Sequence, residues 1–416
     1  MVEAVTMRMH GHAEHDPADY VPREMFEEWR KKDPVELFER RLLDSGVLSD
    51  ATAKETRERL ASTRSTRVGR RLPTRCRTGA RSRRVSMPTK TDTDGVTYLE
   101  AIGQAMMSEM EADPDVFLIG EDVGQFGGAF KVTKGFLEKF GPRRVVDTPI
   151  AETGFTGLAA GAALVGLRPI VEYQFADFIS CAFDPIINVL ARHHYRTGDA
   201  MPVTMRAPFG ARLRAGPTHS QSVESYFAHV PGLKIVMPGS PQDAAGLLIS
   251  SIRDNNPVLY LENKYLYRRL RSDGPINLDP IPLGQAKVVR EGRDVTLITY
   301  SAGVSQGVEV ADELDKEGIS VEVIDIRTLV PLDIDTIVTS VKKTARAVVL
   351  HEAARRLGFG SEIAAEVQEK CFWHLDQPVA RIAAKNTPVP TSPALEDATI
   401  PQPAEIAQTL REVARA

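Results

Sequence analysis

One carboxylic acid, Glu152, stands in a stretch of sequence that otherwise contains no ionisable group. It is the only such residue between Asp147 and Arg168. We expect it at the end of a strand, and the mostly small residues that follow it favour a helix. An unpaired carboxylate is costly to bury in apolar surroundings, and desolvation raises its pKa. Glu152 is therefore the first candidate for acid–base chemistry, as a group that holds or shares a proton near neutral pH.

A second candidate is His219, which lies in the polar stretch Gly216-Pro-Thr-His-Ser-Gln-Ser. Loops at the ends of strands are where α/β folds place reactive side chains. On the residues alone, however, a single histidine in a loop is more often an ordinary surface residue. A catalytic role and a surface role for His219 both stay open at this point.

Two further patterns bear on ligand binding. The stretch Asp254-Asn-Asn-Pro is a turn by composition, and its carbonyl oxygens could also coordinate a hard cation. Gly154, Gly157 and Gly161 lack the spacing of a dinucleotide-binding loop, so we expect them to permit close packing of a helix on a strand. The sequence has no P-loop, no paired cysteines and no His-Glu-x-x-His metal signature.

The composition is that of an ordinary globular protein. The chain has 416 residues, enough for two or three domains, and its formal net charge of −4 gives no reason to expect nucleic acid as a partner. Its three cysteines are far apart, which fits a reducing compartment. No signal peptide is visible, and the most apolar stretch, 157–167, is too short to cross a bilayer. We therefore expect a cytoplasmic protein without a membrane partner.

The first 90 residues differ from the remainder. Residues 1–61 have a helical pattern, with helix starts at Asp16-Pro and Asp33-Pro. Nine of the 25 residues in 62–86 are arginine, and none is lysine or acidic. We expect 62–90 to be a disordered linker, or DNA translated out of frame, rather than a tail that binds nucleic acid or an acidic partner.

From residue 91 onward, short apolar strands alternate with helices. We expect helices over 98–110, 184–195, 304–316 and 405–413, and a further helix that begins at Ser240. The expected strands are 116–120, 169–173, 202–206, 233–238, 257–262, 295–300, 321–325, 347–351 and 379–383. This alternation predicts an α/β fold with two doubly wound domains, 91–275 and 276–416, each with a mostly parallel sheet covered on both faces by helices.

From residue 97 to about residue 414, the sequence resembles the beta subunit of the thiamine-diphosphate-dependent, decarboxylating component of 2-oxo acid dehydrogenase complexes. The matching stretches, in family order, are Ile119-Gly-Glu-Asp-Val-Gly, Gly127-Gly-Ala-Phe-Lys-Val-Thr, Asp147-Thr-Pro-Ile-Ala-Glu-Thr-Gly, His219-Ser-Gln-Ser, Pro231-Gly-Leu-Lys-Ile-Val-Met-Pro, Ile252-Arg-Asp-Asn-Asn-Pro and Asp325-Ile-Arg-Thr-Leu-Val-Pro-Leu-Asp. The resemblance implies a transketolase-like pyrimidine-binding domain, a transketolase C-terminal domain, and an α2β2 heterotetramer with an alpha subunit.

The resemblance also implies roles for single residues. Glu152 would hydrogen-bond the pyrimidine ring of thiamine diphosphate and so help the cofactor to lose its thiazolium proton. Gln174 and Phe178 would contact the same pyrimidine. His219 would act where the acyl group passes to the lipoyl group of the partner acyltransferase, and Glu121 would be an acid in a polar tunnel between paired active sites.

Two metal ions follow from the same resemblance. Mg²⁺ would be held together with the diphosphate by a Gly-Asp-Gly motif of the alpha subunit, and this sequence has no such motif. Because the diphosphate charge then has no counterion on this chain, we expect activity only with an alpha subunit. A structural potassium ion would be held mainly by carbonyl groups at Val203, Thr204, Ser251, Asp254 and Asn256.

The N-terminal 61 residues resemble the C-terminal end of the alpha subunit. The resemblance therefore implies an alpha-subunit remnant joined to a whole beta subunit that starts at Met87. His12 matches an alpha-subunit loop histidine near the substrate, and the neighbouring serine that is phosphorylated in some relatives is Ala13 here. An alternative hypothesis is a non-functional fusion that serves at most as an assembly scaffold.

The resemblance also bears on which 2-oxo acid is the substrate. Stretches such as Gln174-Phe-Ala-Asp-Phe and Tyr265-Leu-Tyr-Arg favour a branched-chain 2-oxo acid, with a pyruvate or acetoin dehydrogenase as the alternative. A transketolase or deoxyxylulose-phosphate synthase would need a diphosphate-binding domain in the same chain, which argues against that hypothesis.

Overall fold

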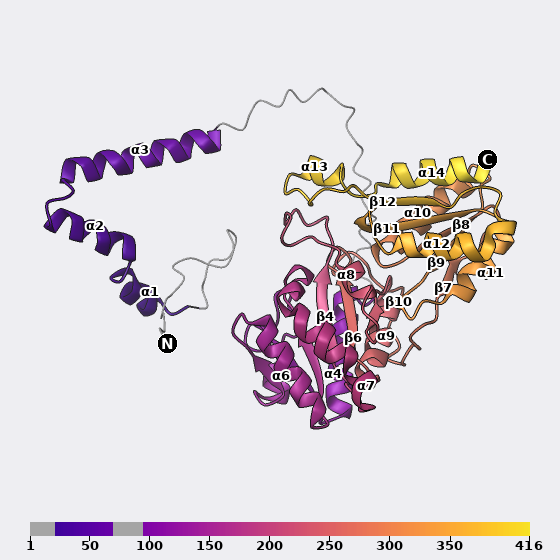
Figure 1. Ribbon diagram of the computed structural model, residues 1–416, viewed down its shortest axis with the longest axis horizontal. Helices are drawn as coiled ribbons and strands as arrows, with labels where there is room; N and C mark the ends of the chain where they lie inside the picture. Colours follow the sequence, from indigo (N-terminus) through magenta and orange to yellow (C-terminus); the bar gives the residue numbers. More distant parts are fainter. Residues whose placement is uncertain (1–20, 70–94) are drawn as a thin grey trace. The chain divides into compact units, whose positions relative to one another are not determined.

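The computed structural model of the chain describes residues 21–69 and 95–416. The chain divides into two compact units, Met1–Met87 and Pro88–Ala416 (Figure 1). The first unit contains the helices α1 (Arg23–Arg30), α2 (Pro34–Asp44) and α3 (Asp50–Gly69). As expected, α2 begins after Asp33, whose side chain accepts a hydrogen bond from the Val35 N–H. The Asp16-Pro pair and His12 lie outside the described residues.

The helix α3 extends further than the sequence indicated. It ends at Gly69, so it includes residues 62–69, which the sequence analysis assigned to the linker. Each residue that extends an existing helix adds one hydrogen bond. Serine, threonine and arginine are compatible with a helix, whereas glycine and proline disfavour it. Residues 70–90 of the expected linker lie outside the described part of the chain. The described helices α1 and α2 bury no residue.

The second unit contains two sheets. The larger has the strand order β10-β5-β6-β4-β3-β1-β2. Six of its strands run parallel, and β10 pairs antiparallel with β5 at one edge. A strand that is covered by helices on both faces of its sheet is buried along its length. The strands β1, β4 and β6 have this burial pattern. The bounds are β1 Val116–Gly120, β2 Val145–Asp147, β3 Arg168–Glu172, β4 Thr204–Phe209, β5 Lys234–Val236, β6 Val258–Asn263 and β10 Thr328–Val330.

Helices cover both faces of this sheet. On one face, α4 (Tyr98–Ala112) packs against α9 (Pro241–Arg253), and these two helices share one apolar core with the strands. Thr97 and Glu100 form a capping box that begins α4, and Ser240 caps α9 as expected. The other face carries α6 (Glu152–Leu164), a 3₁₀ helix (Ala176–Ala182), a π-helix (Pro185–Leu190) and α7 (Ala191–Thr197). Two short helices, α5 (Phe136–Phe140) and α8 (Glu224–Ala228), complete this half.

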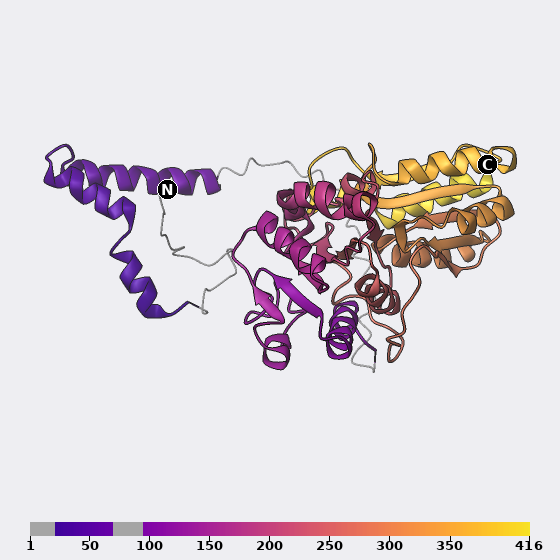
Figure 2. The same ribbon diagram turned by 60° about the horizontal axis from the view of Figure 1, so that its bottom comes forward.

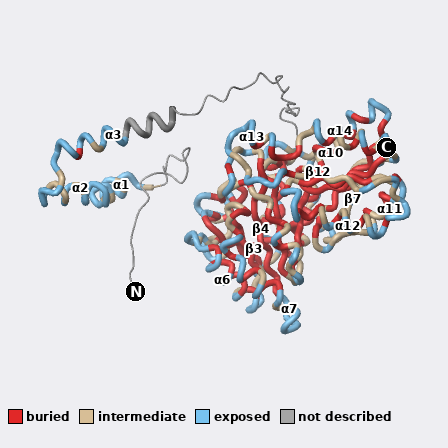
Figure 3. The backbone as a smooth tube through the Cα atoms, turned by 45° about the horizontal axis from the view of Figure 1, so that its top comes forward, coloured by how far each residue is buried: buried red, intermediate tan, exposed pale blue. Residues whose placement is uncertain are grey.

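The smaller sheet has the strand order β12-β11-β8-β9-β7. Its strands are β7 (Lys287–Arg290), β8 (Val295–Thr299), β9 (Val321–Asp325), β11 (Ala347–Ala354) and β12 (Ala380–Ala384), and only β7 is antiparallel to its neighbour. The helices α10 (Ala302–Asp315) and α14 (Pro403–Arg415) pack on one face (Figure 2). The helices α11 (Ile334–Thr344) and α12 (Gly360–Cys371) pack on the other. A 3₁₀ turn (Phe372–His374) and α13 (Pro393–Asp397) lie between these elements in the chain. Figure 3 shows the buried residues concentrated in the two sheets.

The predicted α/β fold with two mostly parallel sheets is confirmed. The strand expected just before Glu152 is β2. Two strands, β7 and β10, were missed, because runs of three or four residues are too short to show a pattern. The helix expected over 184–195 is a π-helix followed by an α-helix. The boundary near residue 275 is also less simple than expected, because β10, from the C-terminal half, is an edge strand of the first sheet.

A charged cluster lies inside the larger sheet. The fully buried guanidinium of Arg206 on β4 donates to both carboxylate oxygens of Glu262 on β6, at 2.5 Å and 2.8 Å. It also donates to Glu172 on β3. Burial raises the pKa of Glu172, and the neighbouring Arg206 acts against that shift. Two buried carboxylates flanking one guanidinium hold three adjacent strands in register.

Candidate active site

Five of the parallel strands point their carboxyl ends at the same edge of the larger sheet, in the order β6-β4-β3-β1-β2. The chain passes from β1 to β2 on one side and then returns to β3 on the other, so the winding direction changes at β1. Open α/β sheets bind their ligands in the crevice at such a point. Residues that directly follow these strands are therefore the first place to look for a site.

Glu152 is the first residue of α6, which follows β2. Its side chain is buried, with only 9% exposure. The start of a helix carries partial positive charge from unpaired N–H groups, which favours a carboxylate there. The sequence-based expectation of a buried acid at a strand-to-helix junction is confirmed.

Glu121 directly follows β1, the neighbour of β2, and it is the acid next to Glu152. Its carboxylate atom Oε1 is buried without a hydrogen-bond partner in the structure. Burial, followed by repulsion from Glu152 and Asp122, raises the pKa of Glu121 to about 7. Glu121 and Glu152 therefore form a buried acid pair, in which the carboxyl group of Glu121 keeps a proton available at neutral pH.

Gln174 follows β3 and connects to the acid pair. Its Nε2 donates a 2.9 Å hydrogen bond to Oδ2 of Asp122, the residue after Glu121. Asp122 has a φ of 57°, a left-handed conformation that aspartate adopts more readily than most residues. The side chain of Gln174 thus links the end of β3 to the end of β1.

Phe178 and His219 form an aromatic group beside Gln174. Phe178 lies on the 3₁₀ helix after β3, and its ring centroid is 5.3 Å from that of His219, edge to face. Phe175 lies 4.6 Å from the same imidazole. The hydroxyl group of Thr218 is 3.1 Å from Nδ1 of His219. The structure therefore places His219 against the aromatic rings of the site.

The sequence analysis missed two charged residues near this group. Lys264 directly follows β6, is almost fully buried, and its Nζ lies 5.6 Å from the Phe175 ring centroid. Nζ donates a 2.7 Å hydrogen bond to the Gly210 carbonyl, and burial lowers the pKa of Lys264 to about 8. Asp177 is also buried and accepts a 3.1 Å hydrogen bond from the Gln221 N–H. The sequence could have identified Lys264 as a candidate, because it is a charged residue directly after a strand that was predicted.

The residues expected to hold potassium lie at the start of β4 and in the last turn of α9 and the residues just after it. The Thr204 hydroxyl group donates a 3.0 Å hydrogen bond to the Ser251 carbonyl. The Asp254 carbonyl accepts a 2.7 Å hydrogen bond from the Arg168 guanidinium, and its carboxylate accepts from the Asn256 backbone N–H at 2.8 Å. The Val203 carbonyl accepts from the Val258 N–H at 2.9 Å. These oxygens thus already have donors within the chain, and the potassium ion stays a prediction.

One expectation about α6 is wrong. Gly154, Gly157 and Gly161 were expected to let the helix approach a strand, but all three are exposed. A Cβ atom added at Gly157 or Gly161 would meet no atom within 4 Å. The residues that face the sheet are instead Phe155, Ala159 and Ala163. Spacing showed that the glycines share one side of the helix, but it could not show which side faces the sheet.

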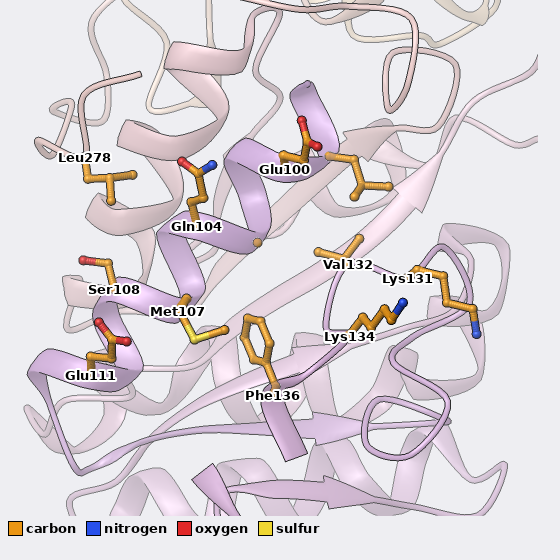
Figure 4. A pocket seen from close by; sticks show the side chains of 12 residues that line it. Glu100, Gln104, Met107, Ser108, Glu111, Lys131, Val132, Lys134, Phe136 and Leu278 are labelled. Carbon is orange, nitrogen blue, oxygen red and sulfur yellow. The ribbon is translucent and has the colours of Figure 1, made fainter. Parts of the chain in front are cut away.

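A cavity of about 480 Å³ lies elsewhere, between α4 and residues 131–136 (Figure 4). It shares no residue with the acid pair or the aromatic group. Two of its charged side chains are already engaged, since Glu100 caps α4 and Lys131 donates to the Phe126 carbonyl. We therefore assign the chemistry to the carboxyl edge of the sheet and not to this cavity.

Within residues 21–69 and 95–416, no group of three or more histidine, cysteine or acidic side chains is arranged to hold a metal ion. In the same ranges, no helix combines the length and the apolar character that a membrane span requires.

Three protein-family descriptions match the sequence. "Transketolase, pyrimidine binding domain" matches residues 94–269, and "Transketolase, C-terminal domain" matches residues 284–406. "Dehydrogenase E1 component" matches residues 1–64. The first two matches correspond to the halves of the second unit that contain most of the larger and the smaller sheet.

Curated proteins resemble most of the chain. It is 47% identical over 313 residues to the protein named "Pyruvate dehydrogenase E1 component subunit beta" from Staphylococcus epidermidis, which covers 75% of this chain and 96% of that protein. The protein of the same name from Rickettsia felis is 45% identical over 320 residues, 76% of this chain and 98% of its own length.

Solved structures share the fold. "Split gene transketolase, inactive beta4 tetramer" superposes with a TM-score of 0.63 at 22% identity, over 77% of this chain and 99% of that chain. "Transketolase from Leishmania mexicana" superposes with a TM-score of 0.56 at 17% identity, over 78% of this chain and 46% of that chain. At these identities the likeness concerns the fold alone.

Proposed function

Since the chain belongs to the family of pyruvate dehydrogenase E1 component beta subunits, we propose that it decarboxylates a 2-oxo acid together with an alpha subunit. The acyl group would then pass to a lipoyl group on a partner acyltransferase. The observation that carries this proposal is the buried acid pair of Glu121 and Glu152, at the point where the winding direction of the larger sheet changes. It provides a carboxyl group that both holds and releases a proton near neutral pH.

The acids and the aromatic group fit the pyrimidine part of thiamine diphosphate. When bound, this cofactor supplies a carbon nucleophile that attacks the keto carbon and accepts electrons as carbon dioxide leaves. Glu152 would accept or share a proton at a pyrimidine ring nitrogen, and Glu121 would keep that proton within the buried site. Phe178 would pack on the ring, and Gln174 would hold its polar edge. The contact of Gln174 with Asp122, the packing of Phe178 on His219 and the raised pKa of Glu121 support these roles.

The partner alpha subunit would supply the remainder of the site. A diphosphate needs a cation and hydrogen-bond donors to offset its charge, and the described part of this chain offers no cluster of metal ligands. We propose that the alpha subunit holds Mg²⁺ and the diphosphate. The match of residues 1–64 to "Dehydrogenase E1 component" supports the further proposal that this segment is a remnant of such a subunit.

Pyruvate is the substrate that the named relatives favour. The two relatives reported above carry pyruvate dehydrogenase in their names at 45% and 47% identity. Branched-chain 2-oxo acids, which the sequence analysis favoured, are the alternative. Both substrate classes present the same reacting atoms, so the acid pair serves either, and only the size of the side-chain pocket distinguishes them.

Reconstitution with a full-length alpha subunit of the same family tests the proposal. The purified complex, supplied with thiamine diphosphate and Mg²⁺, is given carboxyl-labelled pyruvate or carboxyl-labelled 3-methyl-2-oxobutanoate, and released carbon dioxide is counted. We expect release from both, faster from pyruvate. Faster release from the branched acid would reverse the substrate assignment.

The same experiment separates the catalytic role from the scaffold alternative. Release at background level from a complex whose assembly has been verified by light scattering would reject the catalytic role. A chain without residues 1–87 is the matched control, because it removes the first unit and leaves the second unit whole. Activity that appears only after this truncation would mean that the remnant blocks the site.

A further inference from the structure

The loop that carries His219 is held by the opposite half of the second unit. This loop, residues 210–223, leaves β4 on the larger sheet and leads into α8. The Ala211 N–H donates a 2.6 Å hydrogen bond to Glu352 at the end of β11. The Arg212 N–H donates a 3.0 Å hydrogen bond to Glu396 on α13. Two carboxylates from the smaller sheet's half of the molecule therefore bind the backbone where the loop begins.

Ion pairs add to these backbone contacts. The Arg214 guanidinium pairs with Glu396 and donates a 2.7 Å hydrogen bond to Asp397, both on α13. The Glu396 side chain is fully buried, and the Arg214 side chain is 35% exposed. A buried carboxylate needs its partners, because an unpaired charge in that place is strongly unfavourable. Glu396 thus receives one backbone N–H and one guanidinium from the same loop.

The backbone of the loop is shaped around these contacts. Arg212 and Arg214 have φ values of 73° and 61°, a left-handed conformation that arginine rarely adopts without support. Gly216 has a φ of 80°, and a Cβ atom there would lie 2.7 Å from Oγ1 of Thr391. The conformation just before His219 therefore depends on close contact with residues 391–397 (Figure 1).

The two ends of the loop have separate anchors. Lys264 donates to the Gly210 carbonyl, and the Gly210 N–H donates to the Gln221 carbonyl at 3.2 Å. The Gln221 N–H in turn donates to Asp177. Loss of the contacts to α13 would leave these anchors in place and release the stretch between them.

We propose that Glu352, Glu396 and Arg214, together the loop clamp, are positioning residues that hold His219 for transfer of the acyl group to the lipoyl group. This inference rests on the proposed function, in which His219 serves that transfer. The clamp shares no residue with Glu121 and Glu152, which serve decarboxylation. The smaller sheet's half of the molecule would thus control one half-reaction and leave the other unaffected.

The test uses the complex of the full chain with its alpha subunit and compares Arg214→Met and Glu396→Gln with the wild type. Decarboxylation is followed with hexacyanoferrate(III) as electron acceptor, and acyl transfer by mass spectrometry of an isolated lipoyl domain. We expect acyl transfer to fall by about 10- to 100-fold. Decarboxylation should stay within about twofold, since distant sites act independently. Arg214→Lys, which keeps the charge, should restore part of the transfer.

The matched control is Arg411→Met on α14, which breaks the ion pair with Glu317 in the turn after α10. Both half-reactions should be unchanged in this variant. Equal loss of both half-reactions in the clamp variants would show a general structural role and overturn the inference, and so would no loss in either.

Amide hydrogen exchange of the free chain tests the clamp without any activity. Peptides from the loop should exchange faster in Arg214→Met than in the wild type, and peptides from β1 and β2 should not change. If the loop peptides exchanged at the same rate in Arg214→Met and in the wild type, the inference would be overturned. If the wild-type complex decarboxylates neither substrate, the proposed function fails, and the exchange result still decides whether the clamp holds the loop.

Discussion

The Tyr300 hydroxyl group donates a 2.8 Å hydrogen bond to the Glu224 carboxylate, and both side chains are buried. Tyr300 directly follows β8 in the smaller sheet, and Glu224 begins α8 just after the loop that carries His219. Burial raises the pKa of Glu224 to about 7. The two halves of the second unit are therefore joined next to the candidate site by a carboxyl group that titrates near neutral pH.

Glu224 should make the stability of the chain depend on pH. Between about pH 4.5 and 7, the folded state keeps a proton on Glu224 that the unfolded state has released, so folding loses stability as the pH rises through this window. Glu224→Gln removes this dependence and keeps an acceptor for Tyr300. We expect the variant to gain up to about 3 kcal/mol relative to wild type between pH 5 and pH 8. Urea unfolding at both pH values measures this, and an equal difference at both would contradict it.

Glu152→Gln should abolish decarboxylation in the assembled complex. The amide keeps the shape of the side chain but cannot take up or share a proton, so the rate should fall by about 10²- to 10⁴-fold. Carbon dioxide release measures the rate, and light scattering confirms assembly. Glu138→Gln, on the exposed side of α5, is the control and should keep full activity. Near-normal turnover of Glu152→Gln would refute the assigned role.

Arg206→Met should strongly destabilise the second unit. It leaves Glu172 and Glu262 buried without their shared cation, which costs about 3–5 kcal/mol. Urea denaturation measures the loss. Arg411→Met, which breaks a partly exposed pair, should change the midpoint little. A loss for Arg206→Met no larger than that of this control would mean that the cluster contributes nothing to stability.

Gly157→Ala should stabilise the chain. Gly157 is inside α6, and a Cβ atom there meets nothing within 4 Å, so alanine adds helix propensity of about 0.5–1 kcal/mol without a clash. Gly246→Ala in α9 is the matched contrast, because its Cβ would lie 2.5 Å from the Ile281 side chain. It should lower the midpoint of thermal unfolding. A lower midpoint for Gly157→Ala would show that another part of the chain covers this face of α6.

Removal of residues 1–87 should leave the second unit folded. The two units are separately compact, and the described helices α1 and α2 bury no residue. We expect the truncated chain to unfold at the same temperature as the second unit of the full chain, measured by calorimetry. A truncated chain that is unfolded at 25 °C, or that aggregates, would contradict this expectation.

Local sequence was sufficient for most of the elements. Short apolar runs such as β1 indicate strands by their length and their flanking turn residues, and the caps at Thr97 and Ser240 are local chemistry. The short strands β7 and β10 form because a neighbouring strand offers hydrogen bonds, which no local pattern records. For the same reason, the sequence showed that Gly157 and Gly161 share a side of α6 but not that this side faces away from the sheet.

The sequence by itself determined the α/β fold, the isolated acid Glu152 and the set of residues that resemble a known site. Only the tertiary structure decided that Lys264, His219, Gln174, Glu121 and Glu152 come from one edge of the larger sheet. These residues come after β6, β4, β3, β1 and β2, which are neighbouring strands in that order. Strand order depends on hydrogen bonds between segments that are distant in sequence. The same long-range pairing and packing bring Glu352 and Glu396 onto the loop of His219, more than a hundred residues away.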